Sequence, residues 1–286
     1  MAINYDKLIN LEIPVCEQSY TEKDAIIYAL GVGLGMRPAD RGELRFVFEK
    51  DLRVLPSMAV VLAHPGFWPR DLDTGIDWVK VVHGEQAFVL HKPLPAAATV
   101  ISETGIVDIV DKGVGRGALV YSERRLHEKS SGDALATVTQ TFVCRGDGGF
   151  GGPARQRPQE NSMPARSPDF VCELPTSSQA ALIYRLSGDA NPLHADPSVA
   201  TGAGFERPIL HGLATFGVAG HAVLRTICDY DTEQFVSMEA RFTAPVYPGE
   251  TFRTEIWRDG SDVRFQVQCV ERNLLAIGNG RVALRQ

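Results

Sequence analysis

The sequence AALIYRLSGD at residues 180–189 repeats, without a gap, the pattern of DAIIYALGVG at residues 24–33. Ala, Ile, Tyr and Leu recur at equivalent positions, so that Tyr28 corresponds to Tyr184. Farther along, the proline-containing turn APVYPGETF at 244–252 resembles KPLPAAATV at 92–100, allowing one inserted residue. Two matches in the same order, at separations near half the chain, indicate a duplicated domain.

Each half reads as a short helix, a longer helix and then a run of strands. In the second half the longer helix is predicted over residues 213–228, and its glycines indicate close packing. The stretches after it alternate apolar and polar residues. Turns separate them at Pro248-Gly249, Asp259-Gly260 and Arg272-Asn273. Antiparallel strands that follow an apolar helix predict an α+β layer, with the sheet wrapped around that helix.

Residues 144–170, CRGDGGFGGPARQRPQENSMPARSPDF, are dense in Gly, Pro, Arg and small polar residues. Such a composition offers almost nothing to bury and predicts a linker. We therefore place the first repeat at residues 1–147, the linker at 148–169 and the second repeat at 170–286. The RGD at 145–147 is interpreted as part of this linker, not as an adhesion motif.

The composition limits the possible partners. The net charge is −6, whereas nucleic-acid-binding proteins concentrate Lys and Arg, so nucleic acid is not expected as the main partner. The five cysteines are scattered and never form a C-x-x-C pair, which favours reduced thiols. No apolar run approaches membrane-spanning length, and no signal peptide or S-K-L address is evident. We expect a cytoplasmic protein without a membrane segment.

The stretch that carries chemistry is YRLSGDANPLHADPSVATGAGFERPILHGLATFG, residues 184–217. Gly188 ends the preceding helix and Pro192 forbids its continuation. Asp189, Asn191 and His194 are therefore expected on a tight turn, from which polar side chains can point into a cleft.

Two helix starts follow this turn. Asp196-Pro197 predicts an N-cap and a first-turn proline. The amides near Gly212 would open the longer helix and could stabilise a developing oxyanion. A carboxylate and an imidazole within six residues can polarise one water from two sides. In the alternative interpretation, which any isolated D-x-x-x-x-H favours, Asp189 caps a turn and His194 is a buried, satisfied histidine.

GDANPLH followed by RPILHGLATFG resembles the hallmark of the MaoC-like dehydratases, in particular the (R)-specific 2-enoyl-CoA hydratases called hydratase 2. YTEKDAIIYALGVG, VKVVHGEQAFVLHKPLP, DIVDKGVG, GGFGG and ARFTAPVYPGE are similar to the hydratase 2 part of the peroxisomal multifunctional enzymes of type 2. The resemblance covers nearly the whole chain.

The resemblance implies an α+β double hot-dog fold, with two antiparallel sheets that each wrap around a long helix. It also implies that only the C-terminal repeat is catalytic, while the N-terminal repeat accepts the acyl tail. GVGLG at 31–35 agrees, because it has neither acid nor histidine. This glycine run lacks the full G-x-G-x-x-G spacing and no strand precedes it, so a dinucleotide site is not expected.

By position, the resemblance implies that Asp189 and His194 activate water, with Asn191 in support, and that the Gly212 amide binds the thioester carbonyl. His211 is as well explained by a structural role. The residues implied in substrate binding are His83, Gly84, Lys112, Ala190, Pro192, Leu193 and Phe242. Without the resemblance, His83 and Lys112 could equally be surface residues, and Phe242 would be read as a core residue.

The implied reaction is the reversible hydration of a trans-2-enoyl-CoA to a (3R)-3-hydroxyacyl-CoA. CoA is then part of the substrate, and no metal or other cofactor is expected. We expect a homodimer. A hot-dog thioesterase and a non-enzymatic acyl-CoA-binding module are the alternatives. The sequence leaves open the acyl chain, the physiological direction, and which of Asp189 and His194 protonates C2.

Overall fold

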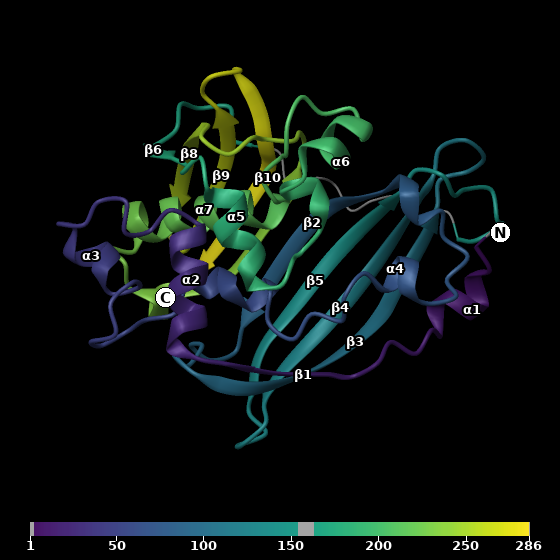
Figure 1. Cartoon of the computed structure of the whole chain (residues 1–286), viewed down its shortest axis with the longest axis horizontal. Helices are drawn as coiled ribbons and strands as arrows, with labels where there is room; N and C mark the ends of the chain where they lie inside the picture. Colours follow the sequence, from purple (N-terminus) through teal and green to yellow (C-terminus); the bar gives the residue numbers. More distant parts are fainter. Residues whose placement is uncertain (1–2, 154–162, 286) are drawn as a thin grey trace.

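The computed structural model describes residues 3–153 and 163–285 (Figure 1). Within these residues one antiparallel sheet has the order β1-β3-β4-β5-β2-β7-β10-β9-β8-β6. The strands of the first half are β1 (Cys16–Tyr20), β2 (Val81–Leu90), β3 (Ala98–Asp111), β4 (Ala118–Glu128) and β5 (Ala134–Cys144). Those of the second half are β6 (Phe170–Pro175), β7 (Phe235–Phe242), β8 (Thr251–Asp259), β9 (Asp262–Cys269) and β10 (Leu274–Leu284).

The helices are short, with one exception. The α-helices are α1 (Tyr5–Ile9), α2 (Glu22–Gly31), α3 (Arg41–Leu44), α4 (Trp68–Asp71), α5 (Ala180–Tyr184), α6 (Pro197–Gly202) and α7 (Gly212–Ile227). The 3₁₀ helices are η1 (Pro56–Val60), η2 (Trp78–Lys80), η3 (Arg185–Ser187), η4 (Pro192–His194) and η5 (Thr232–Gln234). The expected long helix and the expected turns of the second half are thus confirmed to within a residue or two.

The same connections occur in both halves. The first half has the sheet order β1-β3-β4-β5-β2, and the second half has β6-β8-β9-β10-β7. Each strand therefore has a counterpart in the other half, and the whole sheet reads as two copies arranged end to end. This order is that of a double hot-dog, so the predicted fold class is confirmed.

The two halves share one sheet because β2 pairs with β7. The ladder runs antiparallel from Glu85 opposite Arg241 to Val89 opposite Ser237. Pairing of these strands satisfies backbone groups that an edge strand would otherwise expose. The expectation of two separate sheets is corrected accordingly: the sheets of the two repeats are continuous.

The core is centred on α7, whose residues from Ala214 to Leu224 are all buried. The helix contacts β6, β7, β8 and β10 of its own half, and η1 of the other half. Gly217 allows α7 to lie close to Val32 of the first half, because a Cβ at this position would lie only 2.5 Å from Val32 Cγ1. The apolar helix with small residues predicted from the sequence therefore packs against both halves.

The first half departs from the expected pattern, because no long helix occupies the position that corresponds to α7. In its place is η1, a five-residue 3₁₀ helix. Pro65 disfavours helix at His64, and Ala63 has a left-handed φ of 44°, so the chain turns away soon after Val60. The expectation of one long helix in each half is wrong for this half, and its sheet is covered instead by η1, α4 and the intervening loop (Figure 1).

The two matched helices from which the duplication was inferred lie against each other. Tyr28 of α2 and Tyr184 of α5 are fully buried, and their ring centroids are 5.7 Å apart. The hydroxyl of Tyr28 also donates to Ser57 Oγ, at 3.0 Å. Equivalent residues of the two repeats therefore meet at the centre of the molecule.

The beginning of the predicted linker is packed, because its glycine amides bind a buried carboxylate. Gly149 N and Gly151 N donate to Asp111 at 2.7 and 2.9 Å, and Phe150 packs against apolar side chains of the first half. The glycine-rich composition resembled a linker because most of these contacts are made by backbone amides, whose partners the composition does not reveal. Residues 154–162 of the predicted linker lie outside the described residues.

Two further features concern the environment of the chain. The five cysteines are free, and four of them are buried. Among the described residues, no helix is long and apolar enough to cross a membrane.

Candidate active site

The site begins at the turn after η3. Gly188 ends that helix with φ of 117°, a conformation that strongly favours glycine. The main-chain amide of Asn191 then donates to the Asp189 carboxylate at 3.1 Å. The Asn191 side chain accepts from Leu193 N at 3.1 Å and so caps η4. Local hydrogen bonds therefore fix the carboxylate of Asp189, and Asn191 contributes to this through its backbone and its cap.

The neighbouring imidazole is held in one tautomer. His194 is buried, and its Nδ1 lies 2.9 Å from the carbonyl oxygen of Ile209. A carbonyl can only accept, so Nδ1 carries the proton and Nε2 keeps a lone pair. The side chain that was predicted to activate water therefore has a nitrogen that can accept a proton.

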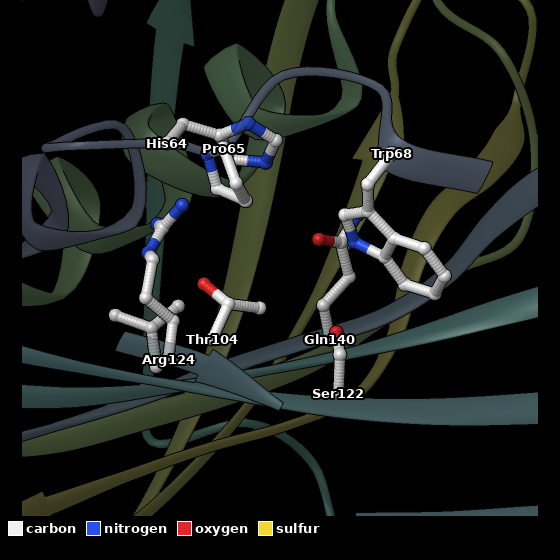
Figure 2. Close-up of a pocket in the computed structure, with 8 residues that line it drawn as sticks. His64, Pro65, Trp68, Thr104, Ser122, Arg124 and Gln140 are labelled. Atoms are coloured by element: carbon white, nitrogen blue, oxygen red, sulfur yellow. The ribbon is translucent and has the colours of Figure 1, made fainter. Parts of the chain in front are cut away.

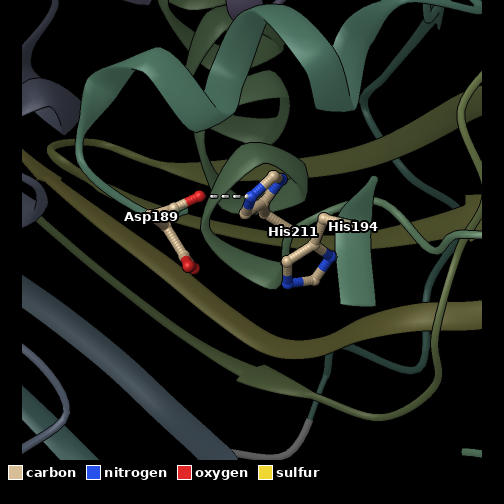
Figure 3. Close-up of side chains that lie close together, drawn as sticks. All are labelled: Asp189, His194 and His211. Carbon is tan, nitrogen blue, oxygen red and sulfur yellow. Dashed lines mark hydrogen bonds between the residues drawn. The ribbon is translucent and has the colours of Figure 1, made fainter. Parts of the chain in front are cut away.

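A second histidine, His211, completes the cluster (Figure 3). Its ring stacks on that of His194, with centroids 3.7 Å apart, and its Nε2 donates to the main-chain carbonyl of Asp189 at 3.2 Å. The sequence left the role of His211 open; its place at the N-cap of α7, next to Gly212, was the available signal. The structure places it in direct contact with both predicted catalytic residues.

The spacing of the cluster suits one bound water. One carboxylate oxygen of Asp189 and one ring nitrogen of each histidine lie within 4.8 Å of one another. Two hydrogen bonds of about 2.8 Å that meet at one oxygen span a similar distance. The carboxylate is the more exposed of these groups, whereas both imidazoles are buried. Water could therefore enter from the side of Asp189 and contact His194 from there.

A helix start lies beside this cluster. Gly212 is the first residue of α7, and His211 makes no side-chain cap. The first amides of a helix have no intrahelical acceptor and lie at its positive end, so they can bind an oxyanion. A Cβ at Gly212 would lie 3.4 Å from the Phe242 ring, and His83 meets that ring edge-on at 4.7 Å. Gly212, Phe242 and His83 are thus brought together, as the resemblance implied.

The other predicted substrate residues occupy different positions. Gly84 sits at a bulge of β2, where a Cβ would lie 2.7 Å from Val143 Cγ2. Ala190 and Pro192 are exposed and Leu193 is half-buried on the catalytic turn. Lys112 is exposed in the turn between β3 and β4, and it is far from the histidine cluster along the sequence. A role for each in substrate binding stays a prediction.

Burial controls the charge of the site. Desolvation lowers the pKa of His194, although the nearby Asp189 charge and the Ile209 carbonyl act in the opposite direction. Desolvation and the neighbouring His194 together lower the pKa of His211 to about 4. Burial likewise lowers the pKa of His83 to about 4. The imidazoles are therefore neutral at neutral pH, which is the form a general base requires.

Asp189, His194 and His211 also have the composition of a metal site. His194 Nδ1 and His211 Nε2 already bond carbonyls, so each ring offers one nitrogen, and the two rings are stacked. The absence of a catalytic metal stays a prediction, which chelation tests below.

We expect acid to destabilise the protein through its buried histidines. Burial lowers the pKa of His221 in α7 to about 4, as it does for His211, whereas an unfolded histidine titrates near 6.5. The unfolded state then binds more protons below that value, so stability is present above pH 6.5 and is lost as the pH falls toward 4. Each histidine contributes on the order of 2 kcal/mol to this loss.

Urea denaturation at pH 7.5 and at pH 4.5 measures this loss as the difference between the two free energies of unfolding. His221→Leu should reduce the difference between the two pH values. His91→Asn, at an exposed position, should leave it unchanged. Equal stability at both pH values would show that these histidines are protonated in the folded protein.

Both halves of the sequence match known families. Residues 18–146 match the MFE-2 hydratase 2 N-terminal domain, and residues 159–279 match the MaoC like domain. The chain is 44% identical to 3-hydroxyacyl-thioester dehydratase Y of Mycobacterium tuberculosis, over 84% of this chain and 82% of that one. It is 36% identical to the peroxisomal enoyl-CoA hydratase 2 of Arabidopsis thaliana, over 94% and 92% of the two chains.

Solved structures show the same architecture. The crystal structure of a MaoC-like dehydratase from Phytophthora capsici matches 99% of each chain, with a TM-score of 0.88 and 31% identity. A Mycobacterium tuberculosis protein described as having a double hotdogfold matches with a TM-score of 0.56 at 15% identity, which shows the fold alone.

The duplicated sheet, with an acid and a histidine beside the start of the long helix α7, places the protein in the double hot-dog class, and relatives named as hydratases and dehydratases show that it is a hydro-lyase. The relatives make this more specific. The chain belongs to the MaoC-like dehydratase family, in the group of the hydratase 2 enzymes.

Proposed function

We propose that the protein hydrates trans-2-enoyl-CoA thioesters reversibly to (3R)-3-hydroxyacyl-CoA, with a water bound between Asp189 and His194. The observation that carries the proposal is the tautomer of His194. Its Nδ1 is committed to the Ile209 carbonyl, so the free Nε2 belongs to a neutral imidazole within the cluster that contains the Asp189 carboxylate. Names of relatives such as enoyl-CoA hydratase 2 supply the reaction class.

The proposed chemistry follows from these groups. The thioester carbonyl accepts from the Gly212 amide, which stabilises the negative charge that develops as the double bond is attacked. His194 Nε2 accepts a proton from water while Asp189 orients it, and the water oxygen forms a bond to C3. A proton from the same pair then reaches C2. Phe242 and His83 form the wall next to the carbonyl, and His211 keeps the two catalytic groups in place.

The N-terminal half is proposed to accept the acyl chain. Its sheet lacks the long helix that fills the second half, and α4 and the loop around His64 cover part of that face instead. Lys112 and the glycine amides held by Asp111 are proposed to lie near the CoA moiety, where a lysine suits phosphate as a point charge. The boundaries of the two repeats stay as proposed from the sequence.

The location and assembly are also proposals. The five free thiols support a reducing compartment, and we propose the cytoplasm. We further propose a homodimer. Cell fractionation tests the first and analytical ultracentrifugation the second.

We expect the purified protein to remove the absorbance of a trans-2-enoyl-CoA without releasing free CoA, and to yield the 3R alcohol. The planar enoyl group exposes one face of C3 to the bound water while Gly212 fixes its carbonyl, so one enantiomer forms. The family resemblance supplies the hand. Dehydrogenases specific for the 3R or the 3S product read out the configuration.

The outcomes separate the alternatives. Release of free CoA would indicate a thioesterase, and binding without turnover would indicate an acyl-CoA-binding module. Consumption of the product by the 3S-specific dehydrogenase would contradict the assigned hand. Activity that survives EDTA supports a reaction without a metal, and loss that Zn²⁺ restores would contradict it.

A further inference from the structure

The inner face of the first-half sheet is apolar at both ends and polar in its middle. Toward one end of its strands, Val100, Leu126 and Ala136 belong to the main core. Toward the other end, Ile106, Val120 and Phe142 belong to a second apolar cluster. Between these clusters the same face carries Thr104, Ser122, Arg124 and Gln140, which are neighbours across β3, β4 and β5.

This polar band lines a small pocket (Figure 2). The sheet residues form one wall, while His64, Pro65 and Trp68 from the covering loop and α4 lie opposite. The cavity measures about 10 Å³, which is close to the space that one water-sized group needs. A polar atom of a ligand could therefore be enclosed there.

Arg124 is the exceptional residue of the pocket. It is 5% exposed, and it forms no ion pair with any carboxylate in the described part of the chain. Its Nη2 donates to the Val60 carbonyl at 2.6 Å, whereas its Nε has no partner among the described residues. Burial lowers the pKa of Arg124 to about 10, so it is still charged at neutral pH. Buried charges are normally paired, and this cation has no carboxylate partner among the described residues.

The pocket is connected to the active site. Gln140, which lines it, lies with Nε2 3.4 Å from His83 Nδ1. The His83 ring in turn meets Phe242, which packs on Gly212. A contiguous set of contacts thus leads from the thioester position to Arg124.

The CoA phosphates are not expected to be the missing anion. Lys112, which the family resemblance assigns to CoA, lies just past the end of β3 and eight residues beyond Thr104, which is about 26 Å of extended chain at 3.3 Å per residue. The second apolar cluster occupies the space along that strand face. An anion at Arg124 must therefore come from the acyl part of the substrate.

We infer that the enzyme prefers 2-enoyl-CoA substrates whose acyl group ends in a carboxylate, and that Arg124 binds this carboxylate. The inference rests on the proposed hydratase function. One carboxylate oxygen that enters the pocket can accept a charge-assisted hydrogen bond from the guanidinium, and the Thr104 hydroxyl, which has no partner among the described residues, offers a further donor. Apolar acyl groups would leave the Arg124 charge uncompensated.

The first test needs no variant. We measure kcat/KM of the full-length protein for trans-2-enoyl-CoAs of graded length that end in a carboxylate, and for the methyl ester of each. At the length that reaches Arg124, the acid should be preferred by about tenfold or more, chiefly through KM, because a charged hydrogen bond of this kind contributes equally to the bound substrate and the transition state. Equal values for acid and ester at every length would overturn the inference.

The second test removes the cation. Arg124→Met, which keeps the length of the side chain, should abolish the preference for the acid and leave unbranched enoyl-CoA hydration within about twofold. Arg125→Met is the matched control, because Arg125 is exposed on the opposite face of the same strand and pairs with Glu123. Thr104→Val should lower the preference severalfold and serves if Arg124→Met does not fold.

The outcomes distinguish the two proposals. If Arg124→Met lowers kcat/KM equally for the acid and for its methyl ester, Arg124 is only structural and the inference is overturned. If the unmodified protein hydrates none of the thioesters, the proposed function itself fails.

Discussion

Asp189→Asn is expected to lower kcat for enoyl-CoA hydration by about two to four orders of magnitude, which is the usual effect of losing a general acid or base. The amide of asparagine can still accept from Asn191 N, so the turn should keep its shape. It cannot, however, carry the negative charge that orients the water and balances a proton on His194. His194→Gln should have a comparable effect, because it removes the nitrogen that accepts the proton.

The two substitutions should not be additive. Residues that activate one water act as a unit, so Asp189→Asn/His194→Gln should be little worse than the more damaging single variant. Initial rates at saturating substrate measure this, with circular dichroism to verify the fold. Asp196→Asn is the matched control: Asp196 is an exposed N-cap of α6 close to His194 in sequence, and its loss should spare kcat. Near-normal turnover by folded Asp189→Asn would refute the assignment.

The second large effect concerns the dependence of one half on the other. Residues 165–286 expressed alone should be poorly soluble, or inactive on long enoyl chains, although they contain Asp189, His194 and Gly212. Removing the first half exposes the edge of β7 that pairs with β2, and the faces of Tyr184 and Gly217 that pack on Tyr28 and Val32. An uncovered strand edge beside apolar surface favours aggregation.

Co-expression with residues 1–153 as a separate chain should restore solubility and activity, because the contacts between the halves are not covalent. Size-exclusion chromatography and the enoyl-CoA assay measure the two effects. A soluble fragment 165–286 with full activity on long chains would show that the first half has no part in the acyl site.

Much of the turn that carries Asp189 and His194 could be predicted because its geometry is local. Gly188, Pro192 and the cap residues Asn191 and Asp196 act on backbone groups two or three residues away, so their effect is encoded in adjacent letters. The duplication was visible because equivalent positions of α2 and of the α5–η3 segment keep the same residue types, including the buried pair Tyr28 and Tyr184. These local signals indicated a duplicated α+β domain and a tight turn, and the family resemblance added the double hot-dog fold and the assignment of the Asp189–His194 pair.

The sequence patterns did not reveal contacts between distant segments. His211 lies 22 residues from Asp189, and the stack with His194 depends on how the turn folds back on the start of α7. Likewise, Arg124 lies in β4, and the alternation of apolar and polar residues in this strand does not single it out. Only the register of β3, β4 and β5 places Thr104, Arg124 and Gln140 on one enclosed face.

The sequence by itself determined the class of fold, the segments that form the strands after α7 and the turn that holds the acid and the histidine. The tertiary structure decided that the two sheets join through β2 and β7, that η1 replaces a second long helix, and that Asp111 binds the glycines after β5. The physical reason is the range of the interactions. Turns and caps depend on steric and hydrogen-bonding rules between near neighbours, whereas strand pairing and the burial of charges depend on which distant residues the packed chain brings together.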